Sequence, residues 1–163
     1  MNYFELFGLP LGPAVDRSLL ATRFFLLQKE NHPDFFTQGT ESEKETSLEQ
    51  SADINKACNI FQHEEKTIEY FLQLIGLIEP REKYNLPPEF LMEMMEINEA
   101  LTEADKETVA KQVEEYNITL SEAIKPVIEQ YDPVNTKHEE LLKLKEYYYK
   151  KKYLKRILDR LPD

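Results

Sequence analysis

The stretch that decides the fold reads Asn31-His32-Pro33-Asp34-Phe35-Phe36-Thr37-Gln38-Gly39-Thr40-Glu41. A proline cannot continue a helix and disfavours helix at the residue before it, so we expect His32-Pro33-Asp34 to lie in a turn. Upstream, residues 17–31 have a helical pattern that begins after the N-cap residue Asp16. Downstream, a second long helix is predicted from Glu41. The sequence therefore predicts two helices joined at this turn.

The segments outside this hairpin also have helical spacing. The second helix of the hairpin is predicted over residues 41–61, and further helices over residues 3–7, 64–74, 89–101, 103–131 and 134–161. Pro126 lies inside one of them and should kink or break it. Alternation with period two is nearly absent, so the predicted fold class is all-α. The side chains predicted to be buried in the first four helices are Leu20, Phe24, Leu27, Leu48, Ala52, Ile54, Ala57, Ile68, Phe71, Leu72 and Ile75.

A change of composition divides the chain into two parts. Glu79-Pro80-Arg81 and Asn85-Leu86-Pro87-Pro88 are poor helix formers and strong turn formers. We therefore expect one domain over residues 1–77, a linker over 78–88 that its prolines stiffen, and a second domain over 89–163. Three helices joined by short turns in the second domain predict an antiparallel three-helix bundle.

Composition excludes several classes of function. The net charge of −11 argues against a general nucleic-acid-binding protein, because binding phosphate requires a positive field. Cys58 is the single cysteine, so an internal disulfide is excluded and no cysteine cluster can hold a metal. No signal peptide or membrane helix is visible, so we expect a cytoplasmic protein. There is no glycine-rich phosphate loop and no nucleophile with a nearby base in sequence, so we expect neither an enzyme nor a cofactor-dependent protein.

The helix from Glu89 to Glu103 has two distinct faces. At about 100° per residue, one narrow arc holds apolar side chains that we expect in the core: Phe90, Met94, Ile97 and Leu101. A second arc holds an apolar cluster with acidic neighbours: Leu91, Met92, Met95, Glu96, Glu99 and Glu103. This second arc is typical of a protein-binding patch, in which methionines adapt to the partner and carboxylates select a basic one. The alternative is that Leu91, Met92 and Met95 pack on the linker or on the first domain.

The order of these pieces resembles a known family. The opening Asn2-Tyr3-Phe4-Glu5-Leu6-Phe7-Gly8-Leu9-Pro10, the framed His32-Pro33-Asp34 and Ala52-Asp53-Ile54-Asn55-Lys56-Ala57 resemble a J-domain, the module that stimulates ATP hydrolysis by DnaK-type chaperones. A linker and a bundle that opens with Phe90-Leu91-Met92-Glu93 extend the resemblance to the HscB family, the co-chaperones of iron–sulfur cluster assembly. The resemblance is strong through Leu77 and around residues 90–103, and weak from Thr108 onward.

The resemblance implies a J-domain, which is a helical hairpin with short flanking helices, followed by a three-helix scaffold-binding domain. It implies that the chain stimulates a DnaK-type or HscA-type ATPase chaperone and delivers the cluster scaffold IscU to it, in the cytoplasm of a bacterium. The residues assigned to chaperone binding are His32, Pro33, Asp34, Arg23 and Lys29. Those assigned to scaffold binding are Leu91, Met92, Met95, Glu96, Glu99, Glu103 and, on the last helix, Tyr148. J-domains usually carry a basic residue directly after the tripeptide, where this chain has Phe35.

Three other interpretations stay open at this point. A J-domain adaptor of the same architecture could deliver a different client. A helical scaffold or nucleic-acid-associated protein could use the basic and aromatic run around Lys150-Lys151-Lys152, although a solvated helix face explains that run as well. A metal-dependent enzyme would need more ligands than His32 and Asp34, and His63 and His138 complete no metal-binding pattern.

Overall fold

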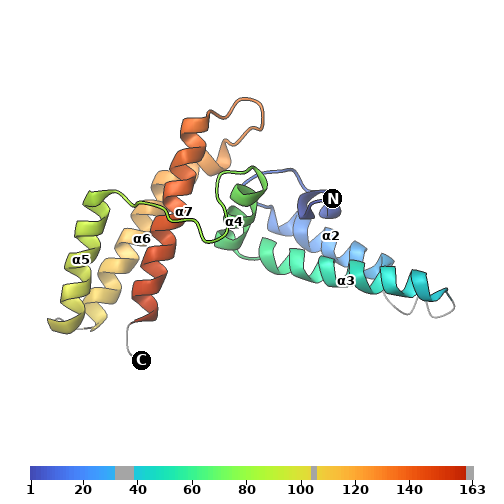
Figure 1. Ribbon diagram of the computed structural model, residues 1–163, viewed down its shortest axis with the longest axis horizontal. Coiled ribbons are helices and arrows are strands. Elements are labelled where there is room, and N and C mark those ends of the chain that lie inside the picture. Colours follow the sequence, from blue (N-terminus) through green and yellow to red (C-terminus); the bar gives the residue numbers. More distant parts are fainter. Residues whose placement is uncertain (32–38, 104–105, 161–163) are drawn as a thin grey trace. The chain divides into compact units, whose positions relative to one another are not determined.

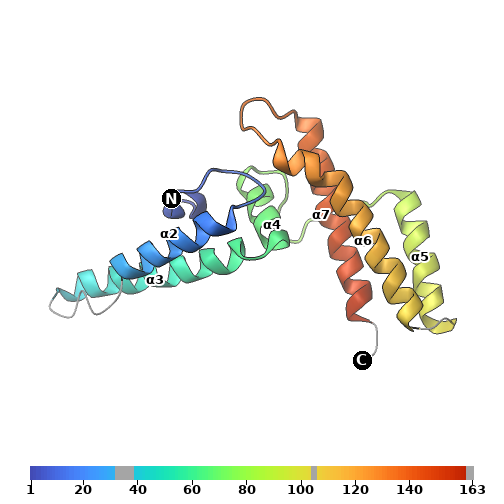
Figure 2. The same ribbon diagram turned by 180° about the vertical axis from the view of Figure 1, so that it is seen from behind.

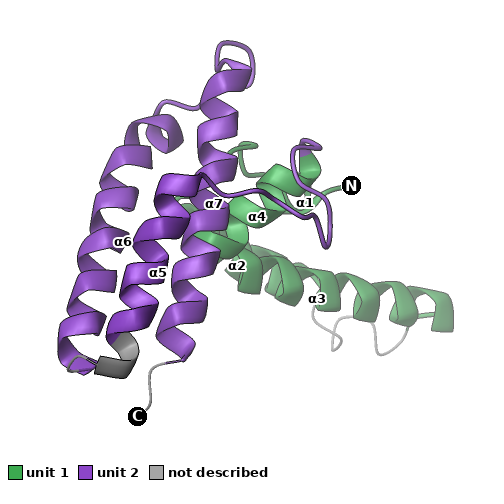
Figure 3. Cartoon of the chain, turned by 60° about the vertical axis from the view of Figure 1, so that its left-hand side comes forward, with its two compact units in different colours: residues 1–74 green, residues 75–163 purple. Residues whose placement is uncertain are grey.

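The computed structural model describes residues 1–31, 39–103 and 106–160, with backbone alone for residues 101–103. All the regular structure in these ranges is helical, in seven helices labelled α1 to α7 (Figure 1), which confirms the predicted fold class. The chain divides into two compact units, Met1–Leu74 and Ile75–Asp163 (Figure 3). The predicted turn at His32-Pro33-Asp34 lies outside the described residues, and the domain bounds 1–77 and 89–163 stay a prediction.

The first unit contains four helices whose ends follow local capping signals. They are α1 (Tyr3–Phe7), α2 (Arg17–Glu30), α3 (Glu41–Phe61) and α4 (Glu64–Leu74). The side chains of Asn2, Asp16 and Thr40 each accept a hydrogen bond from the backbone N–H three residues later, which satisfies a donor that the helix leaves free. Gly8 ends α1 in the left-handed conformation at φ 63°, which a glycine adopts without steric cost.

Aromatic side chains form the core between α1 and the α3–α4 corner. The ring of Phe61 lies 4.9 Å from that of Phe4 and 5.8 Å from that of Phe7, measured between centroids. The Tyr70 hydroxyl accepts a hydrogen bond from the backbone N–H of Tyr3 at 2.9 Å. Burial raises the pKa of this hydroxyl, so Tyr70 stays neutral. The short first helix is therefore fixed to the rest of the unit by both apolar and polar contacts.

The distal halves of α2 and α3, those nearest residues 32–38, are joined by polar side chains. The hydroxyls of Ser47 and Ser51 both donate to the Asn31 carbonyl oxygen at 3.0 Å, and Gln28 donates to Asn55 at 2.8 Å. We call these side chains and the Asn31 carbonyl the polar seam. Figures 1 and 2 show the two helices side by side along this length.

The polar seam corrects part of the predicted core. Leu48 and Ala52 were expected to face α2, but both are exposed, because Ser47 and Ser51 take the positions that face it. Ile54 and Ala57 are buried as predicted. On α2, Leu20 is buried whereas Phe24 and Leu27 are only half-buried. On α4, Ile68, Phe71 and Leu72 are buried, and Ile75 lies just beyond the end of the helix.

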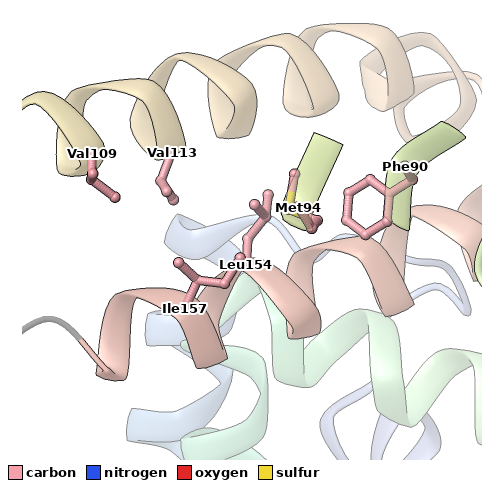
Figure 4. Close-up of a cluster of buried hydrophobic side chains, with 6 residues drawn as sticks. All are labelled: Phe90, Met94, Val109, Val113, Leu154 and Ile157. Atoms are coloured by element: carbon pink, nitrogen blue, oxygen red, sulfur yellow. The ribbon is translucent and has the colours of Figure 1, made fainter. Parts of the chain in front are cut away.

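The second unit is a bundle of α5 (Pro88–Glu103), α6 (Lys106–Glu129) and α7 (His138–Asp159). Pro88 stands at the first position of α5, where its fixed φ suits a helix and its missing N–H costs nothing. The apolar core of the bundle draws on all three helices (Figure 4). It consists of Phe90, Met94, Val109, Val113, Leu154 and Ile157. Phe90 and Met94 are buried and Ile97 is partly buried, which confirms the predicted core face of α5 for these residues; the Leu101 side chain lies outside the description.

One prediction around the α6–α7 connection needs correction. Pro126 lies inside α6, which continues to Glu129, so the helix does not break at the proline itself, and the kink stays a prediction; Gln130 then donates to the Pro126 carbonyl at 3.0 Å. The predicted start of the last helix at Val134 is too early. The Asp132 carboxylate accepts hydrogen bonds from the backbone N–H groups of Val134 and Asn135, at 2.8 and 3.2 Å. This local turn competes with helix, so α7 begins only at His138.

The segment predicted as a linker packs against α7 of its own unit. The Glu82 carboxylate accepts hydrogen bonds from the Tyr149 hydroxyl at 2.6 Å and from the Lys145 ammonium at 2.9 Å. The rings of Tyr84 and Tyr149 are stacked, with centroids 4.4 Å apart and planes within 7° of parallel. Residues 82–84 are therefore attached to the bundle, and the prolines are not the only feature that restricts this segment.

Candidate functional site

The exposed face of α5 is the strongest candidate for a binding surface. Met92 is 65% exposed, Met95 is 59% exposed and Leu91 is 37% exposed. These side chains point away from the core because Phe90 and Met94, one position before Leu91 and Met95, occupy the inward side of the helix. The exposure of these three residues contradicts their packing on the predicted linker, and packing on the first domain stays an alternative. We call Leu91, Met92 and Met95 the α5 apolar patch.

Carboxylates lie beside this patch. Glu96 and Glu99 are exposed, as the helical wheel predicts, whereas the Glu103 side chain lies outside the described residues. A groove of about 410 Å³ between α5 and α6 continues the acidic surface, with Glu96, Glu93 and Glu115 among its lining residues. Exposed methionines with a carboxylate border favour a partner that has apolar side chains beside basic ones.

Tyr116 of α6 lies in the wall of the same groove. Its ring contacts Phe90 in the core, with centroids 5.7 Å apart. Burial, followed by the negative charge of Glu93, raises the pKa of the Tyr116 hydroxyl to about 12. The hydroxyl therefore stays protonated at neutral pH and can donate to a carboxylate. Sequence reasoning missed Tyr116 and the groove, because α5 and α6 are brought together only by the fold.

The aromatic residue assigned on the last helix does not lie on an open surface. Tyr148 is buried, with 7% of its surface exposed, and Lys152 lies over its ring at 5.6 Å. Tyr153 is the residue of the tyrosine-rich run whose ring contacts α5, 5.7 Å from Phe90 in an edge-to-face arrangement. Tyr153 is half-buried and carries Arg156 over its ring at 5.8 Å. The role assigned to Tyr148 stays a prediction, and the contact with α5 makes Tyr153 a second candidate.

The first unit carries the residues assigned to chaperone binding on and just after α2. Arg23 and Lys29 are exposed, as predicted for this helix. Phe25 is 67% exposed and Leu26 is also exposed, so the outer surface of α2 is apolar as well as basic. His32, Pro33 and Asp34 lie outside the described residues. The described neighbour of the tripeptide is Asn31, whose carbonyl belongs to the polar seam.

The basic run on α7 is partly used inside the bundle. Lys150 lies 3.7 Å from Glu146 and over the Phe90 ring, and Lys151 donates to Asn117 at 3.1 Å. Lys152 is exposed. These contacts favour the structural explanation of the run over nucleic-acid binding, since two of its three lysines bind neighbours in the bundle.

The described part of the chain has neither a metal-binding cluster nor a membrane-spanning helix. In the described ranges, no three or more His, Cys, Asp or Glu side chains come together in a way that could hold a metal ion. Among the helices as described, none is both long enough and apolar enough to cross a bilayer. Cys58 is buried, and this burial raises the pKa of its thiol, so the thiol is less reactive than an exposed one.

The chain is similar to several known proteins. Residues 86–161 match the family model described as the HSCB C-terminal oligomerisation domain. Two curated relatives are Co-chaperone protein HscB homologs from Vibrio cholerae serotype O1, strains M66-2 and ATCC 39541. Each is 43% identical over 102 residues, which cover 62% of this chain and 60% of the relative. The match thus spans less than two thirds of the length of these relatives.

Two solved structures are similar over 99% of this chain. The crystal structure of human co-chaperone protein HscB has a TM-score of 0.80 and 28% sequence identity, with 80% of that chain covered. The structure of chaperone HscB from Vibrio cholerae has a TM-score of 0.62 and 32% identity, with 100% of that chain covered. The similarity to solved structures therefore includes both units of the chain.

Proposed function

Because the chain belongs to the HscB family, we propose that it is a co-chaperone that stimulates the ATPase of a DnaK-type or HscA-type chaperone and delivers an IscU-type cluster scaffold to it. The names of its relatives support the co-chaperone role. ATP is hydrolysed by the chaperone, and this chain supplies binding surfaces. The observation that carries the proposal is the exposed α5 apolar patch, separate from the core face of the same helix.

We assign scaffold binding to the second unit. The α5 apolar patch gives the partner an apolar contact, and Glu96, Glu99 and Glu103 would set its orientation through basic side chains. Tyr153, packed against Phe90, is proposed beside Tyr148 as the contributing aromatic of α7. A pre-formed helix face suits this task, because little conformational entropy is lost when the partner binds.

We assign chaperone binding to the first unit. The proposed contacts are His32, Pro33 and Asp34 with Arg23 and Lys29, and the exposed Phe25 and Leu26 add an apolar contribution to α2. This contribution is consistent with Phe35 at the position where J-domains usually carry a basic residue. We therefore expect docking to be less sensitive to salt than a purely ionic contact would be.

Holding both partners on one chain raises the effective concentration of the scaffold at the chaperone. ATP hydrolysis would then fix the chaperone on the scaffold and promote transfer of the cluster to an acceptor protein. Delivery of a different client by the same architecture is the alternative.

Single-turnover ATP hydrolysis by the DnaK-type chaperone of the same organism tests the proposal. The rate is measured with this protein alone, with the scaffold alone and with both. We expect stimulation by the protein, and a rate with both that exceeds the sum of the separate effects. Stimulation that ignores the scaffold would leave a J-domain with another client. No stimulation of a chaperone shown to be active would overturn the co-chaperone proposal.

A further inference from the structure

Two serines of α3 bind the same backbone oxygen at the end of α2. The hydroxyls of Ser47 and Ser51 each donate to the Asn31 carbonyl at 3.0 Å. Ser47 is 3% exposed and Ser51 is half-buried, so these hydroxyls lie in the contact between the two helices and not on the open surface. Asn31 immediately precedes His32, which makes its carbonyl the last described group before the tripeptide assigned to chaperone binding.

This arrangement differs from an ordinary helix end. The last carbonyls of a helix have no partner within the helix and are usually satisfied by water, by a glycine turn or by a local side chain. Here the Asn31 side chain donates to the Leu27 carbonyl at 3.0 Å. The Asn31 carbonyl, in contrast, accepts its hydrogen bonds from hydroxyls of the neighbouring helix α3. An oxygen with two lone pairs accepts two hydroxyls, so its place relative to α3 is defined from two directions.

Hydrogen bonds fix the register of two helices more closely than apolar contacts do. Burial of apolar surface is non-directional, whereas a hydrogen bond weakens steeply as its geometry changes. Ser47, Ser51 and Asn55 stand one helical turn apart on α3, and Asn55 accepts from Gln28 of α2. The seam therefore sets the register of α2 on α3 at the end of the hairpin that leads to His32.

We propose that Ser47 and Ser51 are positioning residues for the chaperone contact: by holding the Asn31 carbonyl, they determine where the chain leaves α2 toward His32, Pro33 and Asp34. The inference rests on the proposed co-chaperone function. Neither serine needs to touch the chaperone. Their effect is to hold Asn31, the residue to which the assigned contact residues are joined, in one place on α3.

The double variant Ser47→Ala with Ser51→Ala tests the inference in the full chain. Its matched control is Thr67→Val, because Thr67 is also buried and its hydroxyl donates to two backbone carbonyls, of His63 at 2.9 Å and of Ile60 at 3.1 Å. Thr67 lies at the α3–α4 corner, at the opposite end of α3. Both variants lose buried hydroxyl contacts in the same unit, but only the double variant loses those to Asn31. Ser51→Thr serves as the conservative variant, since it keeps a hydroxyl.

Two quantities are measured at 25 °C on variants that circular dichroism shows to be folded. The first is the concentration of co-chaperone that gives half-maximal ATPase stimulation. We expect the double variant to raise this concentration about fivefold, whereas Thr67→Val and Ser51→Thr leave it unchanged. The second is the ¹³C chemical shift of the Asn31 carbonyl, read through the following amide. We expect it to move in the double variant alone.

The inference would be overturned if a folded double variant needed the same concentration as the wild type for half-maximal stimulation, or if its Asn31 carbonyl shift did not move. An equal rise of this concentration in Thr67→Val would overturn it too. If the double variant does not fold, Ser51→Ala alone replaces it, with an expected increase of about twofold. An unaltered half-maximal concentration in Ser51→Ala would then overturn the inference. If the wild-type chain does not stimulate the chaperone, the proposed function itself fails. If the wild type stimulates it and the double variant stimulates it equally well, only the inference fails.

Discussion

The two units hold their long helices together in different ways. In the distal half of the α2–α3 hairpin the contacts include hydrogen bonds from Ser47, Ser51 and Gln28. In the α5–α6–α7 bundle they come from an apolar cluster to which every helix contributes (Figure 4). Apolar burial supplies most of the stability of a fold, whereas a buried hydrogen bond contributes little net free energy and specifies geometry.

This difference matches the tasks proposed for the units. The hairpin has to place a few residues at its end, and directional contacts achieve this. The bundle has to present a helix face, and an apolar core on one side of α5 leaves Met92 and Met95 exposed on the other. The variants below test whether stability, scaffold binding and chaperone stimulation separate along this division.

The largest expected effect comes from His32→Gln. We expect ATPase stimulation to fall to the basal rate of the chaperone, because the residue assigned to the contact is lost, while the affinity for the scaffold stays unchanged. The measurements are single-turnover hydrolysis and calorimetric titration with the scaffold. A folded variant that loses both activities would contradict the separation of tasks between the two units.

Met94→Ala should have the largest effect on stability. Met94 is fully buried, and its truncation should cost about 2–5 kcal/mol in the free energy of opening of the bundle. Residue-resolved hydrogen exchange measures this quantity, and we expect faster exchange in α5, α6 and α7 with little change in α2 and α3. The control Met92→Ala, on the exposed side of the same helix, should change it by less than about 0.5 kcal/mol. Equal effects of the two variants would contradict the assignment of the two faces.

Leu91→Ala combined with Met92→Ala should weaken scaffold binding about tenfold to thirtyfold, because it removes the apolar contact of the patch. Calorimetric titration gives the affinity, and stimulation of the chaperone in the absence of scaffold should remain. Ile118→Ala is the matched control, since Ile118 is an exposed apolar residue of α6 outside the patch. A comparable loss of affinity in Ile118→Ala would show that binding is not specific to the patch.

The smallest expected effect concerns Glu82. Its hydrogen bond from Tyr149, followed by that from Lys145, lowers the pKa of the carboxyl group below its ordinary value of 4.5. Because the folded-state pKa is the lower one, the contribution to stability is present above about pH 4.5 and is lost as the pH falls through the folded-state value. We expect it to be under about 1 kcal/mol.

Near-ultraviolet circular dichroism of the Tyr84–Tyr149 stack, followed from pH 6 to strongly acidic pH, measures this effect. Glu82→Gln should lack the acidic step that the wild type shows. Glu140→Gln serves as the control, because Glu140 forms an exposed ion pair with Lys143 within α7. A step of the same size in Glu82→Gln would mean that another group titrates.

Local signals predicted the helices well. The bounds of α1, α3 and α4 match the prediction, because Asn2 and Thr40 satisfy the first free N–H groups of α1 and α3, and Gly8 ends α1 at a positive φ. The predicted start of α7 is wrong for a local reason too. The side chain of Asp132 competes for backbone N–H groups that an early helix turn would have used.

The sequence predicted less well which side chains are buried and which distant residues are in contact, because both depend on which helices pack together. Leu48 and Ala52 fit an apolar stripe as well as Ile54 and Ala57 do, and only the contact with α2 shows that Ser47 and Ser51 take the inner positions. The contacts of Glu82 with Lys145 and Tyr149 join residues more than 60 positions apart. In the run Tyr147-Tyr148-Tyr149 the first two side chains are buried and the third is half-buried, a division that helix packing selects.

The sequence by itself determined the all-α class, the positions of most helices and the two faces of α5, because caps, prolines and apolar periodicity act over a few residues. It also placed His32-Pro33-Asp34 after α2 by chain order alone. Only the tertiary structure decided that hydroxyls of α3 hold the end of α2, that residues 82–84 pack on α7 and that Tyr153 rather than Tyr148 contacts Phe90. These contacts join helices distant in sequence, and the packing of whole helices, not local preference, selects which side chains meet.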